Sequence, residues 1–326
     1  DPFLSGEMVV PYIQGVQSNG VAACVKHFAL NNQEINRFTT DVKVDDRTLY
    51  EIYLPAFKAA VQKGQAWSLM SSYNLYKGQW AGENQYLLDD ILRGEWGFDG
   101  VVVSDWGGIH LPDEVIPHGV DIEYGSWTDG LTMGMTNAYD QYHMANSYKE
   151  RLADGRADEK VLDERIRRIM RLEYRTNMNR ERPFGQFTSP EHYDAARKIG
   201  AEGIVLLKNE GGILPINENS VKKILMVGEN AFKMMTVGGG SSSLKVKKEV
   251  SPLDGLKARL AGKAEVVWER GYVGTTSGTY NGVVAKQDLS ESRSADKLIA
   301  DAIAAAKEAV ASKLTGTIVK EIYVPG

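Results

Sequence analysis

The chain has 326 residues, of which 43% are hydrophobic and 25% charged, and its formal net charge is -5. This is the balance of an ordinary globular protein, long enough for about two domains of roughly 100–200 residues each. It gives no sign of the clustered basic surface of a nucleic-acid binder, and no apolar run approaches the roughly 18–20 residues of a membrane span. The single cysteine, Cys24, excludes an intrachain disulfide framework and is predicted to be a core residue of the run "VAACV".

The first half of the chain alternates short apolar runs with helical patterns. Strands are predicted at 20–28, 66–74 and 99–106, with a shorter one at 119–125. Helices are predicted at 47–64, 84–97 and 140–179, the last broken near Gly155. Such alternation is typical of a parallel sheet covered by helices, so an α/β fold is expected.

A change of composition at "NRERPFGQFTSPE" predicts a linker, after which a second α/β unit begins. Its expected elements are a helix, a strand and a turn within 192–216, strands at 222–230 and 264–271, and helices at 251–262 and 294–312. The predicted domains are therefore 1–178, a linker at 179–199, and 200–326.

One dense basic run, "RIRRIMR" at 165–171, stands out in the predicted helix of the first half. Its arginines alternate with Ile166, Ile169 and Met170 at helical spacing. The interpretation preferred here is a solvated helix face rather than a binding surface.

Three successive predicted strands end on residues that are unusual beside a buried strand. Lys26 and His27 end the first, Tyr73 the second, and Asp105 with Trp106 the third. The carboxyl ends of parallel strands meet at one edge, where loops present side chains to a common site. A carboxylate there is a candidate nucleophile or base, and a tryptophan offers a face for a sugar. Taken singly, Asp105 could equally cap a helix, and the Lys26–His27 pair could be structural.

Long segments of the chain resemble glycoside hydrolase family 3, which contains many β-glucosidases and β-xylosidases. The resemblance rests on "VKHFALNNQEINR" (25–37), "LMSSYNLYKGQWAGENQYLLDDILRGEWGFDGVVVSDWG" (69–107) and "AEGIVLLKNEGGILPI" (201–216), and it extends from residue 1 to about 308. It implies a partial (β/α)8-type barrel that carries the nucleophile, followed by an incomplete α/β sandwich domain.

The same resemblance implies roles for the residues at the strand ends. Asp105 would be the nucleophile that forms a glycosyl-enzyme intermediate, and Lys26 and His27 would bind hydroxyls of the sugar in the −1 subsite. Tyr73 would lie near the nucleophile, and Trp106 would help to form the +1 subsite. The expected activity is that of a retaining, exo-acting β-glucosidase on β-linked gluco-oligosaccharides or aryl glucosides. A β-xylosidase and a degenerate carbohydrate-binding homologue are the alternatives.

Other parts of the family pattern are absent from this sequence. The Asp-bearing segment and the Gly-Arg motif that bind the −1 sugar lie upstream of its first residue, and the glutamate that serves as acid/base is not identifiable. Glu229 and Glu210 are the nearest substitutes by position, and neither is assigned this role. The sequence is therefore expected to be part of a longer protein.

The sequence also allows expectations about cofactors, partners and cellular location. No metal is expected, since no H-E-x-x-H pair occurs. No cofactor and no nucleic-acid partner are expected either. A homodimer is left open. The first residues, "DPFLSGEMV", do not look like a natural start, so the compartment stays open, with a periplasmic or secreted location preferred.

Overall fold

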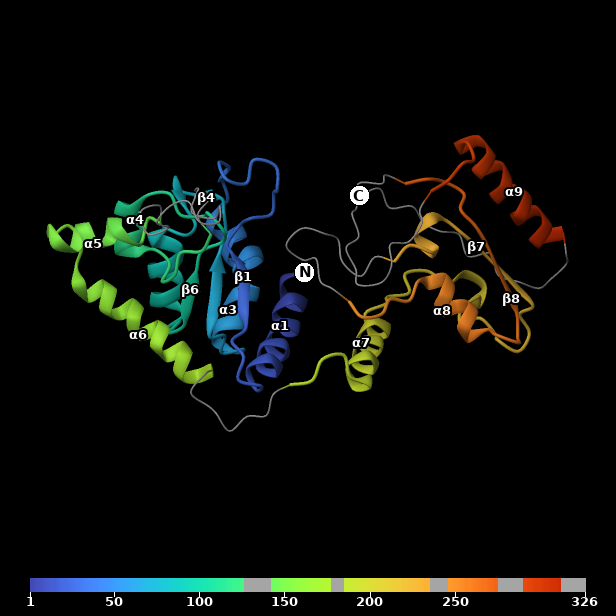
Figure 1. Cartoon of the computed structure of the whole chain (residues 1–326), viewed down its shortest axis with the longest axis horizontal. Helices are drawn as coiled ribbons and strands as arrows, with labels where there is room; N and C mark the ends of the chain where they lie inside the picture. The colour runs from blue at the N-terminus through green and yellow to red at the C-terminus, as the bar shows by residue number, and fades with distance from the viewer. Residues whose placement is uncertain (126–141, 177–184, 235–245, 275–289, 312–326) are drawn as a thin grey trace. The chain divides into compact units, whose positions relative to one another are not determined.

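The computed structural model describes residues 1–125, 142–176, 185–234, 246–274 and 290–311. The chain divides into two compact units, Asp1–Phe184 and Gly185–Gly326, and each combines helices with strands (Figure 1). The expected α/β class is therefore confirmed.

A parallel sheet of three strands forms the centre of the first unit. It consists of β1 (Cys24–Phe28), β3 (Ser68–Ser71) and β6 (Val101–Val103), in the order β1-β3-β6. These are the three long strands that the apolar runs predict. The shorter strand expected at 119–125 is reduced to a single parallel bridge between Val103 and Ile122.

Helices flank this sheet along the chain. They are α1 (Pro2–Gln17), α2 (Asp46–Thr48), α3 (Pro55–Gln62), α4 (Pro112–His118), α5 (Asn146–Ala153) and α6 (Glu159–Thr176), with π-helical turns η1 (Leu49–Tyr53) and η2 (Tyr86–Glu95). Figure 1 shows α1 and α3 beside β1, and α6 beside β6. A small second sheet joins β2 (Asp41–Val42), β4 (Leu75–Tyr76) and β5 (Gln79–Trp80). Helix α1 is not among the predicted elements, and its start is capped by the Asp1 side chain.

Aromatic and aliphatic side chains form the core between the sheet and its helices. Phe28 packs edge-on against Phe57 and Trp96, with ring centroids 5.2 and 5.8 Å apart. Leu69 and Val102, from the two neighbouring strands, are fully buried. Burial of each such side chain contributes about 1.5–3 kcal/mol, so the sheet is a rigid base for the loops at its edge. Cys24 is exposed on β1, which corrects the expectation of a core cysteine.

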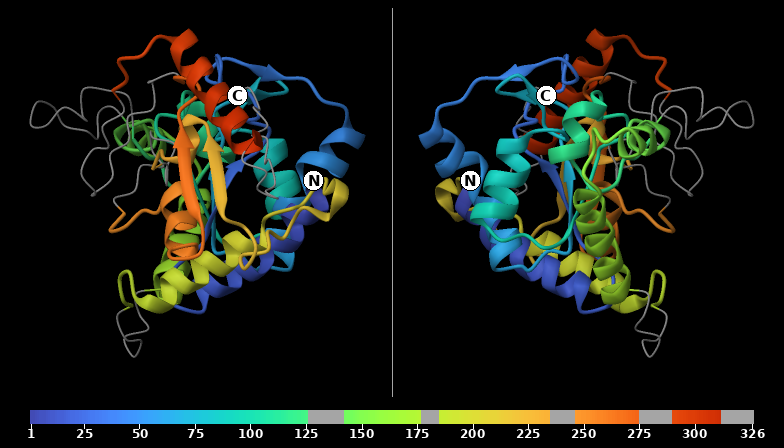
Figure 2. Two further views of the ribbon diagram at one scale, coloured as in Figure 1. Left: turned by 90° about the vertical axis from the view of Figure 1, so that its right-hand side faces the viewer. Right: turned by 90° about the vertical axis from the view of Figure 1, so that its left-hand side faces the viewer.

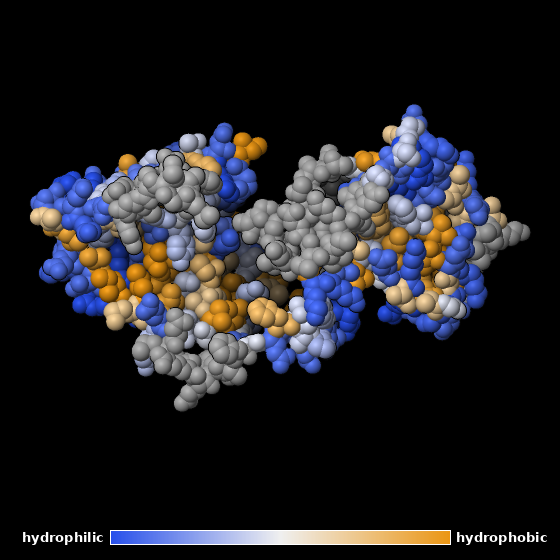
Figure 3. All heavy atoms as spheres, viewed as in Figure 1, coloured by the Kyte–Doolittle hydropathy of each residue, from blue (hydrophilic) through white to orange (hydrophobic). Residues whose placement is uncertain are grey.

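Two arginines of α6 face the protein, so the prediction of a solvated arginine face is wrong for Arg165 and Arg168, whereas Arg167 is exposed as predicted. Arg165 is only 2% exposed and is the one buried residue of α6, all of which the structure describes. Its guanidinium donates to carbonyl oxygens at the end of α4, including those of Val115 and Ile116 (both 2.6 Å). Ile166 and Met170 are exposed instead. Figure 3 shows that hydrophobic side chains also gather on the surface of the first unit. Helical spacing alone could not tell which face turns inward.

The second unit is built on two parallel strands. β7 (Lys223–Val227) pairs with β8 (Glu265–Glu269), and both strands and the helix α8 (Pro252–Arg259) lie where predicted. Ser251 caps α8 as its Ser-Pro start indicates. The other elements are α7 (Pro190–Glu202), η5 (Glu210–Gly212), η6 (Glu229–Ala231) and α9 (Ala295–Ala311), and α9 packs on the strand pair (Figure 2).

One predicted strand of the second unit is absent from the structure. The apolar residues 204–207 form no strand, and Leu207 is 91% exposed. A strand needs a neighbour for its backbone N–H and C=O groups, and among the described residues β7 and β8 pair only with each other. No helix within the described ranges is long and apolar enough to cross a membrane.

Candidate active site

His27 and Asp105 meet at the carboxyl edge of the parallel sheet. His27 lies near the end of β1 and Asp105 follows β6 by two residues, with β3 between the two strands. The imidazole Nε2 lies 3.3 Å from Asp105 Oδ2, and Asp105 is 8% exposed. The structure thus brings together two residues that are 78 positions apart in sequence (27 and 105), as the argument from parallel strand ends predicts.

The second carboxylate oxygen of Asp105 is held by its own loop. Oδ1 accepts a hydrogen bond from the backbone N–H of Trp106 (2.8 Å), and the Asp105 carbonyl oxygen accepts one from Gly108 N–H (3.0 Å). These bonds close a tight turn rather than start a helix, because α4 begins only at Pro112. The alternative that Asp105 caps a helix is therefore excluded, and the turn fixes the direction of the carboxylate.

The imidazole of His27 favours its neutral form. Burial lowers the pKa of His27, and the charge of the nearby Asp105 opposes this only in part. A neutral imidazole can donate one hydrogen bond and accept another. His27 therefore offers the site a polar, uncharged partner beside the carboxylate.

Tyr73 lies in the same cluster, two residues beyond the end of β3. Its hydroxyl donates to the carbonyl oxygen of Trp106 (2.9 Å), and the residue is buried. Burial, followed by the hydrogen bond and the charge of Asp105, raises the pKa of Tyr73 above its ordinary value. The phenol therefore stays protonated and remains a hydrogen-bond donor next to Asp105.

Lys26 and Trp106 are the exposed members of the predicted set. Lys26 lies on β1 beside His27, and no carboxylate in the described part of the chain pairs with it. Trp106 is 55% exposed, and its ring centroid is 6.3 Å from that of Tyr124. Both side chains are thus accessible from solvent at the edge where Asp105 lies.

Arg37 is a neighbour of the site that the sequence analysis did not single out. Its guanidinium carbon lies 4.4 Å from the ring centroid of Tyr73, and its Nη1 is 2.6 Å from Glu34 Oε2. A cation over a tyrosine ring is a favourable contact worth about 0.5–2 kcal/mol. Arg37 ends the segment "NNQEINR", and this position shortly after the predicted strand end was the one sequence feature that could have pointed to it.

Glu83 supports the loop that follows Asp105 and was also missed. The residue is fully buried, and its Oε1 accepts hydrogen bonds from the backbone N–H groups of His110 and Leu111 (2.7 Å for the latter). Burial raises the pKa of Glu83 to about 7, although the two N–H groups lower it. The His110 ring also stacks on Trp80, with centroids 4.2 Å apart. Glu83 was missed because a single glutamate in a polar turn is not part of any periodic sequence pattern.

Asp121 lies on the segment next to Asp105 in a very different environment. Its Oδ2 accepts from Arg93 (2.9 Å) and from the backbone N–H of Val102 (2.8 Å), and its Oδ1 accepts from Arg168 (2.8 Å). The side chain is fully buried. With both oxygens bound to cationic or N–H donors, Asp121 joins α6 and η2 to the sheet.

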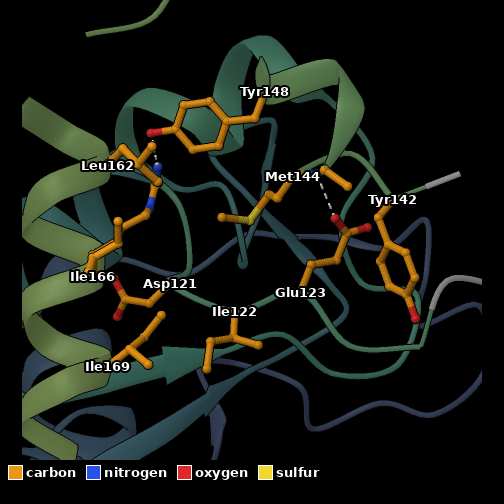
Figure 4. A pocket seen from close by; sticks show the side chains of 11 residues that line it. Asp121, Ile122, Glu123, Tyr142, Met144, Tyr148, Leu162, Ile166 and Ile169 are labelled. Carbon is orange, nitrogen blue, oxygen red and sulfur yellow. Dashed lines mark hydrogen bonds between the residues drawn. The ribbon is translucent and has the colours of Figure 1, made fainter. Parts of the chain in front are cut away.

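A cavity of about 390 Å³ lies between this segment and α6. Its lining residues are Asp121, Ile122, Glu123, Tyr142, Met144, Ala145, Tyr148, Leu162, Arg165, Ile166 and Ile169. Figure 4 shows the Glu123 carboxylate, which accepts a hydrogen bond from the Met144 N–H (2.8 Å). Most of the other lining side chains are apolar. Neither His27 nor Asp105 lines this cavity, so it is separate from the site.

Glu229 and Glu210, the nearest substitutes by sequence position for the acid/base glutamate, differ in burial. Glu229 is buried, pairs with Lys233 and Arg270 (3.3 Å to the latter), and accepts from Gly274 N–H (2.7 Å). Burial would raise the pKa of Glu229, but the bonds from Lys233 and Gly274 outweigh it and leave the pKa below its ordinary value. Glu210 is exposed and pairs with Lys208. A general acid needs a raised pKa, which the environment of Glu229 does not provide.

No group of three or more His, Cys, Asp or Glu side chains that could hold a metal ion occurs among the residues that the structure describes. A fixed carboxylate, a neutral imidazole, a phenol donor and an exposed indole form a small polar site with one aromatic wall.

Comparison with known proteins gives matches along both units. The model of the glycosyl hydrolase family 3 N terminal domain matches residues 1–172, and that of the family 3 C-terminal domain matches 204–315. The beta-glucosidase BoGH3A of Bacteroides ovatus is 49% identical over 308 residues, which cover 93% of this chain and 40% of that protein.

Solved structures agree with these matches. A Bifidobacterium adolescentis GH3 beta-glucosidase has a TM-score of 0.74 and 32% identity, covering 93% of this chain and 40% of its own. The beta-glucosidase 3B of Thermotoga neapolitana in complex with glucose has a TM-score of 0.72 and 37% identity, covering 82% and 36%. The chain thus spans less than half the length of these relatives.

Proposed function

Because the chain belongs to glycosyl hydrolase family 3, we propose that it carries the nucleophile of a retaining, exo-acting β-glucosidase, and that this nucleophile is Asp105. The observation that supports the proposal best is the pairing of Asp105 with His27 at 3.3 Å, at the common edge of parallel strands. Sites of α/β sheets are built at this edge. The finer arrangement, a partial (β/α)8-type barrel followed by an α/β sandwich domain, is part of the same proposal.

In the proposed reaction, a carboxylate oxygen of Asp105 attacks the anomeric carbon of a terminal β-glucosyl residue. The glycosidic C–O bond breaks, its electron pair stays on the leaving oxygen, and a general acid supplies the proton to that oxygen. Water then attacks the glycosyl-enzyme ester, gives up a proton to the same group as base, and releases glucose and free Asp105. No residue of this chain is assigned as the acid/base.

The other side chains of the site would bind and orient the sugar. Lys26 and His27 would hydrogen-bond hydroxyl groups of the −1 sugar, and the neutral His27 can do so as donor or acceptor. Tyr73, kept protonated, would turn its O–H from the Trp106 carbonyl oxygen to the Asp105 carboxylate and stabilise that carboxylate when it leaves the intermediate. Trp106 would stack against the leaving group in the +1 subsite.

The test is labelling with 2,4-dinitrophenyl 2-deoxy-2-fluoro-β-D-glucoside, followed by intact-mass and peptide mass spectrometry. Its activated leaving group departs without a general acid, so the experiment depends on the nucleophile alone. We expect one stable fluoroglucosyl adduct, on the peptide that contains Asp105.

Two comparisons make this test decisive. Asp105→Asn, which keeps the shape of the side chain, should take up no label, and the corresponding fluoroxyloside should label wild type more slowly if glucose is the preferred −1 sugar. An adduct on another carboxylate would refute the assignment of Asp105. Glucose binding without any adduct would favour the degenerate carbohydrate-binding homologue.

A further inference from the structure

The indole of Trp106 lies against the backbone of Gly125, where an added side chain would have to displace it. Gly125 has a φ of +55°, in the left-handed region that glycine adopts most readily. A methyl group built on Gly125 would overlap the indole Cε3 and lie 2.7 Å from Cδ2 and 3.0 Å from Cβ of Trp106. The conformation of the backbone and the contact therefore both favour glycine.

Backbone hydrogen bonds hold the two segments in this register. Ser104 N–H donates to the Ile122 carbonyl oxygen (2.9 Å), and Gly107 N–H donates to that of Tyr124 (3.0 Å). Between these two bonds, Tyr124 N–H donates to the Ser104 hydroxyl (2.8 Å). Trp106 comes directly before Gly107, and Gly125 directly follows Tyr124. The bond between Gly107 and Tyr124 therefore brings the Trp106 indole into contact with Gly125.

We infer that Gly125 is a positioning residue that seats the Trp106 indole and thereby sets the enzyme's preference for the group on the leaving side of the bond. The substrate class in this inference, β-glucosides, is taken from the proposed function. Trp106 is the exposed aromatic residue next to Asp105, and an indole held against the backbone presents one fixed face to a leaving sugar or aryl ring. Moving the indole would weaken that contact while Asp105, held by its own turn, keeps its position.

The chain offers a matched control for the backbone conformation. Gly155 has a φ of +80°, and a methyl group built on it would meet nothing within 4 Å. Gly125→Ala and Gly155→Ala therefore carry a similar backbone penalty, and only the first displaces an aromatic ring. Both variants should fold, with similar and small losses in Tm.

The first measurement is the ¹⁹F NMR spectrum of protein labelled with 5-fluorotryptophan, in which Trp106→Phe assigns the Trp106 signal among the six tryptophans. Gly125→Ala should shift or broaden this signal, and Gly155→Ala should leave it unchanged. An unchanged Trp106 signal in Gly125→Ala would overturn the inference.

The second measurement compares leaving groups. Gly125→Ala should raise KM for cellobiose about tenfold, the scale of a lost aromatic contact, and leave kcat/KM for β-glucosyl fluoride within about twofold. An equal loss on both substrates would mean a general structural role and refute the inference. If wild type hydrolyses neither substrate, the proposed function fails, and the NMR comparison still decides whether Gly125 seats the indole.

Discussion

Asp105 and Asp121 lie on adjacent segments of one sheet, and the groups around them give them opposite properties. Asp121 is fully buried between Arg93 and Arg168, with a backbone N–H on the same oxygen as Arg93. Asp105 has no arginine partner among the described residues; its neighbours are one backbone N–H, the imidazole of His27 and the hydroxyl of Tyr73. A carboxylate enclosed by cations stabilises the fold, whereas a nucleophile must keep an oxygen free for substrate. The comparison separates a structural aspartate from a candidate reactive one.

Asp105→Asn should have the largest effect, and only on catalysis. The amide keeps the hydrogen bond to Trp106 N–H but is a poor nucleophile, so kcat/KM on aryl β-glucosides should fall on the order of 10³–10⁴-fold. The free energy of unfolding should change by less than about 1 kcal/mol. Steady-state kinetics and urea unfolding measure the two effects, and near-normal turnover would remove Asp105 from the chemistry.

Asp121→Asn should act in the opposite way. Removing one partner of a buried ion pair leaves Arg93 and Arg168 uncompensated, so the free energy of unfolding should fall by about 3–5 kcal/mol. Asp99→Asn is the matched control, since Asp99 pairs with Arg175 at the surface (2.9 Å) and its loss should cost less than about 1 kcal/mol. Equal losses in the two variants, measured by urea unfolding, would contradict the distinction.

Glu83→Gln should change how stability depends on pH. The pKa of Glu83 is about 7 in the fold, above its ordinary value of 4.5, so the fold favours the protonated form. Its contribution is therefore fully present below pH 4.5 and is lost as pH rises to about 7, which amounts to about 3 kcal/mol. Glutamine keeps an acceptor for His110 and Leu111 and cannot ionise. Unfolding curves between pH 4 and 8 should thus converge at low pH and favour the variant at high pH; parallel curves would argue against a buried, titrating Glu83.

Much of the sheet could be predicted from sequence, because a strand buried on both faces is a continuous apolar run. "VVV" at 101–103 shows this directly, and β3 is largely buried as well. β1 departs from the rule, because Cys24 and Lys26 on it are exposed. The exposed apolar run 204–207 marks the limit of that rule. A run of this kind indicates what could be buried, but a strand exists only where a partner strand lies beside it.

The site was predictable only in part. The rule that parallel strands end at one edge correctly brings His27, Tyr73 and Asp105 together. Their roles in catalysis stay predictions. Glu83 and Gly125 could not be found, because each acts through a contact with a residue far along the chain, and neither occurs in a repeating pattern. For α6, the spacing of the arginines gives the period of the helix but not which face carries the partner carbonyls.

The inward-facing arginine of α6 has a consequence for the temperature dependence of the fold. Arg165 is held by carbonyl oxygens of α4 rather than by apolar packing, so releasing α6 exposes less apolar surface than releasing an ordinary amphipathic helix. Apolar surface is the main source of the heat-capacity increase on unfolding. The attachment of α6 should therefore weaken little on cooling, unlike the Phe28 core, whose hydrophobic stabilisation fades in the cold.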